Sequence, residues 1–165
     1  MRHLILALAL LPTIALAAAP NAAAEREARS FLPPCKPGPD RQLCLIHQRN
    51  FIEQYVYAKA GDFPAQRSTA ESFDTLHLKT DAVLSDYVGM PRNQLQSCAW
   101  WLVDAQQDTS LANPDALIRH ACGGLGGVMQ SLAMHRADLL LHELRTHPAR
   151  MPSDDWEPIV AGLKP

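Results

Sequence analysis

Residues 40–61 read DRQLCLIHQRNFIEQYVYAKAG, and this stretch decides the fold. Its apolar residues recur at helical spacing, so that one side of a helix would be apolar. Asp40 can cap the first turn, and Gly61 is typical of the position just beyond the end of a helix. The stretch therefore predicts a helix of about five turns with one buried face.

Comparable start signals divide the rest of the chain into further helices. Asn113, Pro114 and Asp115 form the clearest start, because they supply a capping side chain, a proline at the first helical position and an acid in the first turn. Sustained alternation of apolar and polar residues is missing from the sequence, so a β-sheet is not expected. The sequence predicts an all-α fold of antiparallel helix hairpins joined by short loops. Helices are expected to begin near Asp40, Pro64, Asn93, Asn113 and Gly127, with a last short helix capped by Ser153.

The chain begins with the pattern of a secretory signal peptide. Arg2 and His3 precede an apolar run over residues 4–16, and residues 15–17 read Ala-Leu-Ala, a small-x-small cleavage site. The run is shorter than the roughly 20 residues that span a bilayer. We therefore expect a leader over residues 1–17, or 1–24 with a later cut, and a secreted, periplasmic mature chain with no stable membrane insertion.

The mature chain is expected to have two parts. Residues 18–39 are rich in alanine and proline, which predicts a tail with at most one short helix. Residues 40–165 are expected to form one helical domain. The formal net charge is −2, and it becomes −3 when Arg2 is removed with the leader. Such a weak negative charge gives no reason to expect nucleic acid or an anionic membrane as a partner.

The four cysteines allow three pairings. Loop closure favours Cys35 with Cys44, which would attach the proline-rich segment to the start of a helix. Cys98 and Cys122 lie at equal distances from a turn near Ser110, which places them at the same height on two antiparallel helices. Zinc ligation is the alternative, but the cysteines lack C-x-x-C spacing. Oxidised pairs also agree with an exported chain.

Residues 58–66 read AKAGDFPAQ and residues 89–93 read GMPRN. Ala70 and Phe73 follow the first segment, and Trp100, Trp101 and Ala105 follow the second. Together they resemble a Sel1-like repeat, a relative of the tetratricopeptide helix pair, over residues 58–107. The resemblance implies two helices that pack closely through small residues, with the aromatic pair in the groove between repeats.

The chain departs from the repeat pattern in two ways. About ten extra residues lie between Phe73 and Gly89, and Ser97 and Asp104 stand where the family has small apolar residues. A lone repeat cannot bury both of its faces, so the flanking helices are expected to act as caps. The resemblance implies protein–protein interaction or an adaptor role, often in bacterial envelopes.

Candidate chemistry is sparse. His135, Asp138 and His142 share one side of a predicted helix, but the two histidines are two turns, about 10.5 Å, apart, too far for one metal ion. The glycine-rich residues 123–127 lack the lysine and the preceding strand of a phosphate-binding loop. No serine stands in a G-x-S-x-G elbow. We therefore predict no catalytic residue, no metal and no cofactor. Glu53, Asp74, Asp81, Asp86 and Asp104 are the carboxylates weighed for glycoside cleavage, and the sequence brings no two of them together.

The candidate binding residues are aromatic and basic. Trp100 and Trp101 point about 100° apart on a helix, so one can enter the core while the other anchors a partner in a groove; the simpler alternative is that both pack between helices. Tyr55 has the same ambiguity, and Arg67 and Arg92 could form a polar rim. The sequence thus predicts a secreted module that binds another protein or an envelope component. A small secreted hydrolase acting on cell-wall material is the alternative function.

Overall fold

The computed structural model describes residues 21–74, 89–153 and 156–163. These residues form helices and connecting segments without any β-strand, which confirms the predicted all-α fold. The expected signal peptide and most of the segment between Phe73 and Gly89 lie outside the described residues. The described helices are α1 (Ala22–Ser30), α2 (Arg41–Lys59), α3 (Phe63–Phe73), α4 (Gln94–Gln107), α5 (Pro114–Cys122) and α6 (Gly127–Thr146).

Side-chain caps set three of the helix starts. The Oδ1 atom of Asp62 accepts from Ala65 N at 2.8 Å at the start of α3, and Asn93 and Asn113 accept from the third residue beyond them in α4 and α5. Each such cap stabilises its helix by about 1 kcal/mol. Asp40 precedes α2 as expected, but its side chain makes no cap hydrogen bond. Gly61 has a φ of 94°, a backbone conformation that favours glycine, and it turns the chain from α2 into α3.

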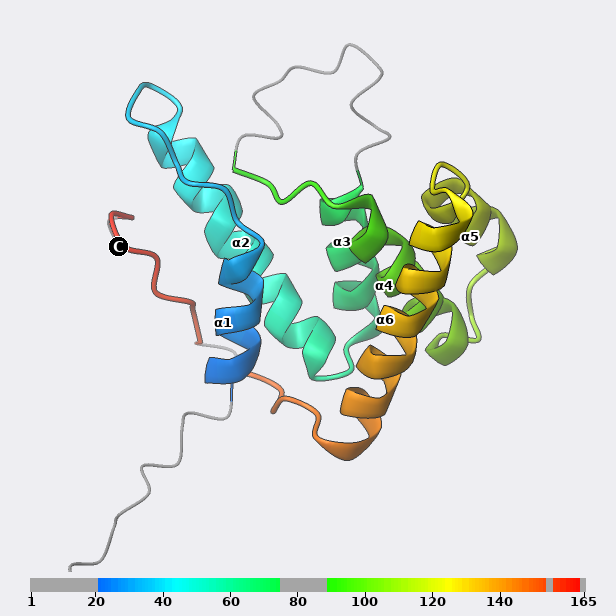
Figure 1. Ribbon diagram of the computed structural model, residues 1–165. Coiled ribbons are helices and arrows are strands. Elements are labelled where there is room, and N and C mark those ends of the chain that lie inside the picture. The colour runs from blue at the N-terminus through cyan, green and yellow to red at the C-terminus, as the bar shows by residue number, and fades with distance from the viewer. Residues whose placement is uncertain (1–20, 75–88, 154–155, 164–165) are drawn as a thin grey trace, which may run out of the picture.

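The helices form a run of antiparallel neighbours (Figure 1). α2 and α3 are joined by a tight turn. The start of α3 lies beside the end of α4, where Gln66 Nε2 donates to Gln107 Oε1 at 2.8 Å. At the opposite end of the α3–α4 pair, where α3 ends and α4 begins, Asn93 N donates to Phe73 O at 3.1 Å. α1 packs on α2, while α5 and α6 pack on α4. α4 therefore has neighbours on several sides.

An aromatic cluster fills the core between the first four helices. Phe51, Tyr55 and Phe73 are fully buried, and Trp100 meets Tyr55 edge-on with ring centroids 5.5 Å apart. Phe31, just beyond α1, packs edge-on against Phe73 at 5.0 Å. Edge-on contacts of this kind add to the stabilisation from apolar burial. The core thus joins α1, α2, α3 and α4 into one body.

The segment expected to be a tail is partly built into this body. Ala24 and Ala28 of α1 are buried against α2, and Gln48 Nε2 donates to Pro33 O at 2.5 Å. The expected tail is therefore helical over Ala22–Ser30, and this helix is packed on α2.

The prediction of a short helix after Ser153 is wrong for the described residues of that segment. Residues 156–163 contain only a turn. Pro158 explains the difference, because a proline in a helix interior removes a hydrogen bond and clashes with the preceding turn. The segment lies along α1 and α2 instead (Figure 1), where Arg29 Nη2 donates to Ile159 O at 2.8 Å and Trp156 contacts the ring of Tyr57. Among the described helices, none is long and apolar enough to cross a membrane.

Candidate functional site

The structure places the three candidate aromatic residues inside the core. Tyr55 and Trp100 are fully buried, and Trp101 is 5 % exposed. The interpretation of one tryptophan as a groove anchor is therefore wrong in this structure, and the simpler alternative of packing between helices describes both. The reason is that α4 is covered by α3, α5 and α6, so positions about 100° apart on it both face neighbours.

The two candidate arginines lie at opposite ends of α4. Arg67 is part-buried and joins α3 to the end of α4, with Nε 3.4 Å from Asp104 Oδ2 and Nη2 2.8 Å from Asp108 Oδ2. Arg92 is exposed and lies just before the start of α4. The structure therefore does not bring the five candidate binding residues together in one groove.

Asp104 is a buried carboxyl on α4 at the packing surface with α3. Burial raises the pKa of Asp104, and the nearby charge of Arg67 offsets part of that rise. Its Oδ1 atom has no hydrogen-bond partner among the described residues. One arginine, Arg67, thus accommodates this buried carboxyl by reaching across from α3.

A cluster of ion pairs connects α1, α2 and α6. Glu27 binds Lys59, with Oε2 and Nζ 3.1 Å apart, and it also pairs with Arg136. Lys59 pairs in addition with Glu143, and Arg136 Nη2 lies 3.4 Å from the hydroxyl of Tyr55. We call Glu27, Lys59, Arg136 and Glu143 the ion-pair cluster.

The electrostatics of the ion-pair cluster keep Glu27 ionised. Burial alone would raise the pKa of Glu27, but Lys59 and Arg136 outweigh burial and hold this pKa below its usual range. Burial and the Glu27 charge raise the pKa of the Tyr55 hydroxyl well above its usual value. The cluster therefore joins three helices through fixed charges, with a neutral phenol at its inner edge.

A cavity of about 270 Å³ opens beside the ion-pair cluster, and it is lined by two carboxylates, as the active site of a glycoside hydrolase would be. Glu27 and Glu143 both line it, together with Lys59 and His147. A glycosidase needs one carboxyl with a raised pKa to act as general acid. Glu27 has the opposite shift, and both carboxylates bind Lys59. The arrangement fits a structural ion-pair network better than an acid–base pair.

Replacing Glu27 with glutamine should lower the free energy of unfolding at neutral pH by about 1–2 kcal/mol. The value lies between those of exposed and fully buried ion pairs, because the pairs of Glu27 are part-buried. Because the folded pKa of Glu27 lies below the unfolded one, its contribution is present above the unfolded pKa and disappears as the pH falls through the folded pKa. The difference between the variant and the parent chain should therefore shrink toward acid pH. Urea unfolding followed by circular dichroism over a pH series checks this.

Glu25→Gln is the matched control, because Glu25 lies on the same helix and pairs only with Arg29 four residues later among the ion pairs described. This part-buried pair joins two residues of the same helix, and it should contribute no more than about 0.5 kcal/mol. Equal effects of the two substitutions at neutral pH would show that the ion-pair cluster contributes nothing beyond a single pair within one helix.

Both disulfides have the pairing expected from the sequence. Cys35 is bonded to Cys44 with 5.8 Å between their Cα atoms, and Cys98 is bonded to Cys122 with 4.9 Å between theirs. The first attaches the segment after α1 to the start of α2, and the second attaches α4 to the end of α5. A side chain at Gly89 would approach Cys44 Sγ to 2.7 Å, so the first bridge also needs glycine at that position.

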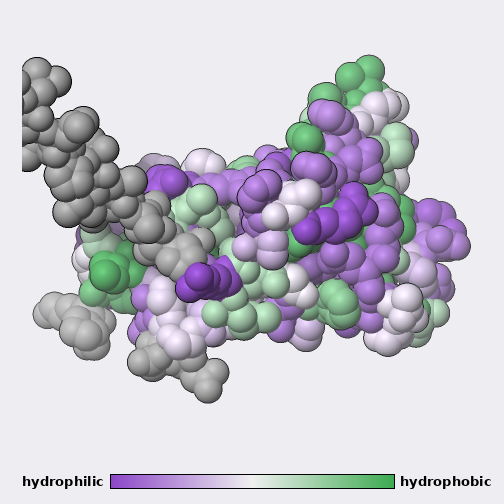
Figure 2. All heavy atoms as spheres, turned by 90° about the horizontal axis from the view of Figure 1, so that it is seen from below, coloured by the Kyte–Doolittle hydropathy of each residue, from purple (hydrophilic) through white to green (hydrophobic). Residues whose placement is uncertain are grey.

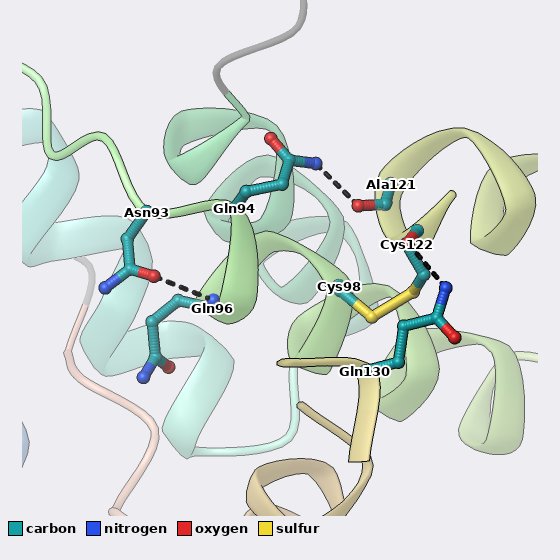
Figure 3. Close-up of a disulfide and its surroundings, with 7 residues drawn as sticks. All are labelled: Asn93, Gln94, Gln96, Cys98, Ala121, Cys122 and Gln130. Carbon is teal, nitrogen blue, oxygen red and sulfur yellow. Dashed lines mark hydrogen bonds between the residues drawn. A yellow bond between two sulfur atoms is a disulfide. The ribbon is translucent and has the colours of Figure 1, made fainter. Parts of the chain in front are cut away.

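An apolar pocket of about 280 Å³ is built around the Cys98–Cys122 bridge. Figure 3 shows the bridge flanked by two glutamines: Gln94 donates to the carbonyl of Ala121 at 2.6 Å, and Gln130 donates to the carbonyl of Cys122 at 3.1 Å. These bonds fix the end of α5 against α4 and α6. The pocket is lined by Cys98, Leu102, Ile118, Arg119, Cys122, Gly123, Gln130 and Met134. We call it the bridge pocket.

The bridge pocket has an apolar interior and a polar rim. Met134 is 52 % exposed at its edge, and Arg119 is exposed on α5. Leu102, Ile118 and Met134 are not among the residues predicted from the sequence, although a signal for Leu102 and Ile118 was present. The expected Cys98–Cys122 pair already places α4 against α5, and the apolar residues within one turn of each cysteine must then lie around the bridge.

The outer face of α6 carries further exposed residues. Val128, Leu132 and Leu139 are exposed, and His135, Asp138 and His142 lie on the same side of the helix. In the described part of the chain, no group of three histidines, cysteines or acids is placed to hold a metal ion. Figure 2 shows hydrophobic residues interspersed among hydrophilic ones on the side of the molecule that it views.

Comparison of the chain with protein-family models, with curated proteins and with solved structures finds no match.

Proposed function

We propose that this protein is a secreted, periplasmic binding module that holds another protein through the bridge pocket. The observation that carries the proposal is an apolar pocket whose walls are fixed by a disulfide and whose edge exposes Met134. Exposed apolar residues beside a preformed pocket are typical of binding sites on soluble proteins.

Rigidity supports a binding role. A site that is already ordered before the partner arrives loses less conformational freedom on binding, which improves affinity. Here the Cys98–Cys122 bridge and the two glutamine side chains hold α4, α5 and α6 together around the bridge pocket. Two disulfides also suit an oxidising compartment, and the leader pattern at residues 1–17 and the Sel1-like resemblance point the same way.

The size and rim of the bridge pocket define the partner's chemistry. Its volume of about 280 Å³ lies just below the range of about 300–1,000 Å³ in which small-molecule sites usually fall. One large apolar side chain of a partner suits it better than a whole ligand. Arg119 at the rim favours an acidic residue next to that side chain.

A capture experiment with matched variants tests the proposal. The mature chain with both bridges intact is immobilised and exposed to envelope extract, and the captured proteins are identified by mass. Met134→Lys, which puts a charge at the edge of the bridge pocket, should reduce capture of a specific partner at least tenfold. Ile159→Lys is the control, because Ile159 is 86 % exposed and lies on the C-terminal segment beside α1.

Equal capture by the Met134 and Ile159 variants would show that the bridge pocket is not the binding site. The hydrolase alternative has its own outcome in the same preparation. If the parent chain captures no protein above background and degrades cell-wall material, the binding proposal is wrong and the hydrolase function replaces it.

A further inference from the structure

The outer face of α6 is apolar at positions where a surface helix is normally polar. Val128 is 78 % exposed, Leu132 is 48 % exposed and Leu139 is 44 % exposed. The intervals of four and seven residues place all three on one side of the helix. The opposite side of α6 already contributes its buried residues, including Ala137 and Leu140, to the core. α6 thus has two apolar faces, and only one of them is covered by this chain's described residues.

The pattern on this outer face is self-complementary. We propose that it docks onto the same face of a second copy, with the two α6 helices antiparallel about a twofold axis that passes close to His135 and Arg136. In that register Leu132 of each copy lies opposite Leu139 of the other. A twofold contact repeats each pairing, so two leucine pairs would flank the axis.

The polar residues agree with the same axis. His135 and Asp138 are both exposed, and they lie on the same flank of the leucines. In an antiparallel helix pair, each flank of one helix meets the same flank of the other. The register that pairs Leu132 with Leu139 therefore also brings His135 of each copy close to Asp138 of the other. Apolar and polar complementarity about one axis is the reason to choose a second copy as the occupant.

The length of α6 allows this contact. Its 20 residues span about 30 Å, and the part from Val128 to Glu143 covers about four turns. Val128 would then pack near the last turn of the other α6. A single helix pair buries less surface than a standard interface, so we expect a weak dimer with a Kd on the order of 10 µM. The outer face of α6 and the bridge pocket use different sides of this helix, since Gln130 and Met134 are the α6 residues that line the pocket. The proposed dimer therefore does not depend on the proposed binding function.

Sedimentation equilibrium of the mature, disulfide-intact chain across a wide concentration range tests the dimer. The parent chain should associate reversibly. The double variant Leu132→Lys with Leu139→Lys should remain monomeric, because the register places lysine opposite lysine. The double variant Leu132→Glu with Leu139→Glu should remain monomeric for the same reason. An equimolar mixture of the two doubles should associate again, since each lysine then lies opposite a glutamate.

The mixture makes the test specific. Circular dichroism of each double variant checks that the helices persist, and Ile159→Lys should dimerise like the parent chain. A parent chain that stays monomeric at concentrations well above the expected Kd would overturn the proposal. The proposal would also be overturned if either double variant still dimerised, or if a mixture of the two folded double variants failed to associate. Either result would mean that a different surface or register is used. If the parent chain is monomeric and the leucine substitutions abolish capture of another protein instead, that protein is the occupant of this face.

Discussion

Replacing Trp100 with alanine should lower the free energy of unfolding by about 3–5 kcal/mol, the usual cost of emptying a tryptophan site in a core. Trp100 is fully buried on α4 and packs edge-on against Tyr55. Its Nε1 atom has no hydrogen-bond partner among the described residues. The loss would therefore come from packing and from the cavity left behind, and urea unfolding of the oxidised mature chain measures it.

Trp100→Phe is the matched variant, because it keeps an aromatic ring in the core and should cost clearly less than Trp100→Ala. The same pair of variants decides between core and partner-binding roles. If Trp100→Ala left the free energy of unfolding unchanged but removed capture of a partner, the indole would be a surface anchor and its buried position here would be contradicted.

Removing the Cys98–Cys122 bridge should have the next largest effect. In the chain-entropy model, a bridge between residues 24 apart stabilises the fold by about 3.5 kcal/mol, whereas the Cys35–Cys44 bridge, with a separation of 9, gives about 2.7 kcal/mol. The double variant Cys98→Ala with Cys122→Ala should therefore unfold at lower urea than Cys35→Ala with Cys44→Ala. It should also weaken capture, because the bridge forms a wall of the bridge pocket.

The comparison between the two bridges is the control, since both variants lose one disulfide and two thiols. A larger loss of stability from the Cys35–Cys44 variant would mean that loop length does not govern the contribution of these bridges. Full stability after removal of Cys98 and Cys122 would contradict the view that this bridge holds α5 against α4.

The helices and both disulfides could be predicted because their signals are local. Asn93 and Asn113 cap the helices that follow them, and each hydrogen bond spans three residues. The Cys98–Cys122 pairing followed from equal distances to one turn. The last expected helix, capped by Ser153, also had a local signal against it: Pro158 lies inside it, and the described residues 156–163 contain only a turn.

The candidate site could not be predicted in the same way, because its residues are brought together by tertiary packing. Trp101 seemed able to reach the surface until the neighbours of α4 were known, and those neighbours cover it. Glu27 and Arg136 pair across 109 residues of sequence, and no local pattern links them. Glu27 also lies in an alanine-rich segment that was expected to be a tail, so no ion pair with another helix was expected there. Only the close spacing of Ala24 and Ala28 on one side of α1 indicated that this helix packs against another.

Site-specific photocrosslinking in living cells tests whether the bridge pocket binds an envelope protein. A photoreactive amino acid is placed at position 134, at the edge of the bridge pocket, or at position 159, on the exposed C-terminal segment. We predict a crosslinked adduct of this chain with one other envelope protein from position 134 and none from position 159. No adduct from position 134 in a folded, exported chain, or equal adducts from both positions, would contradict this prediction.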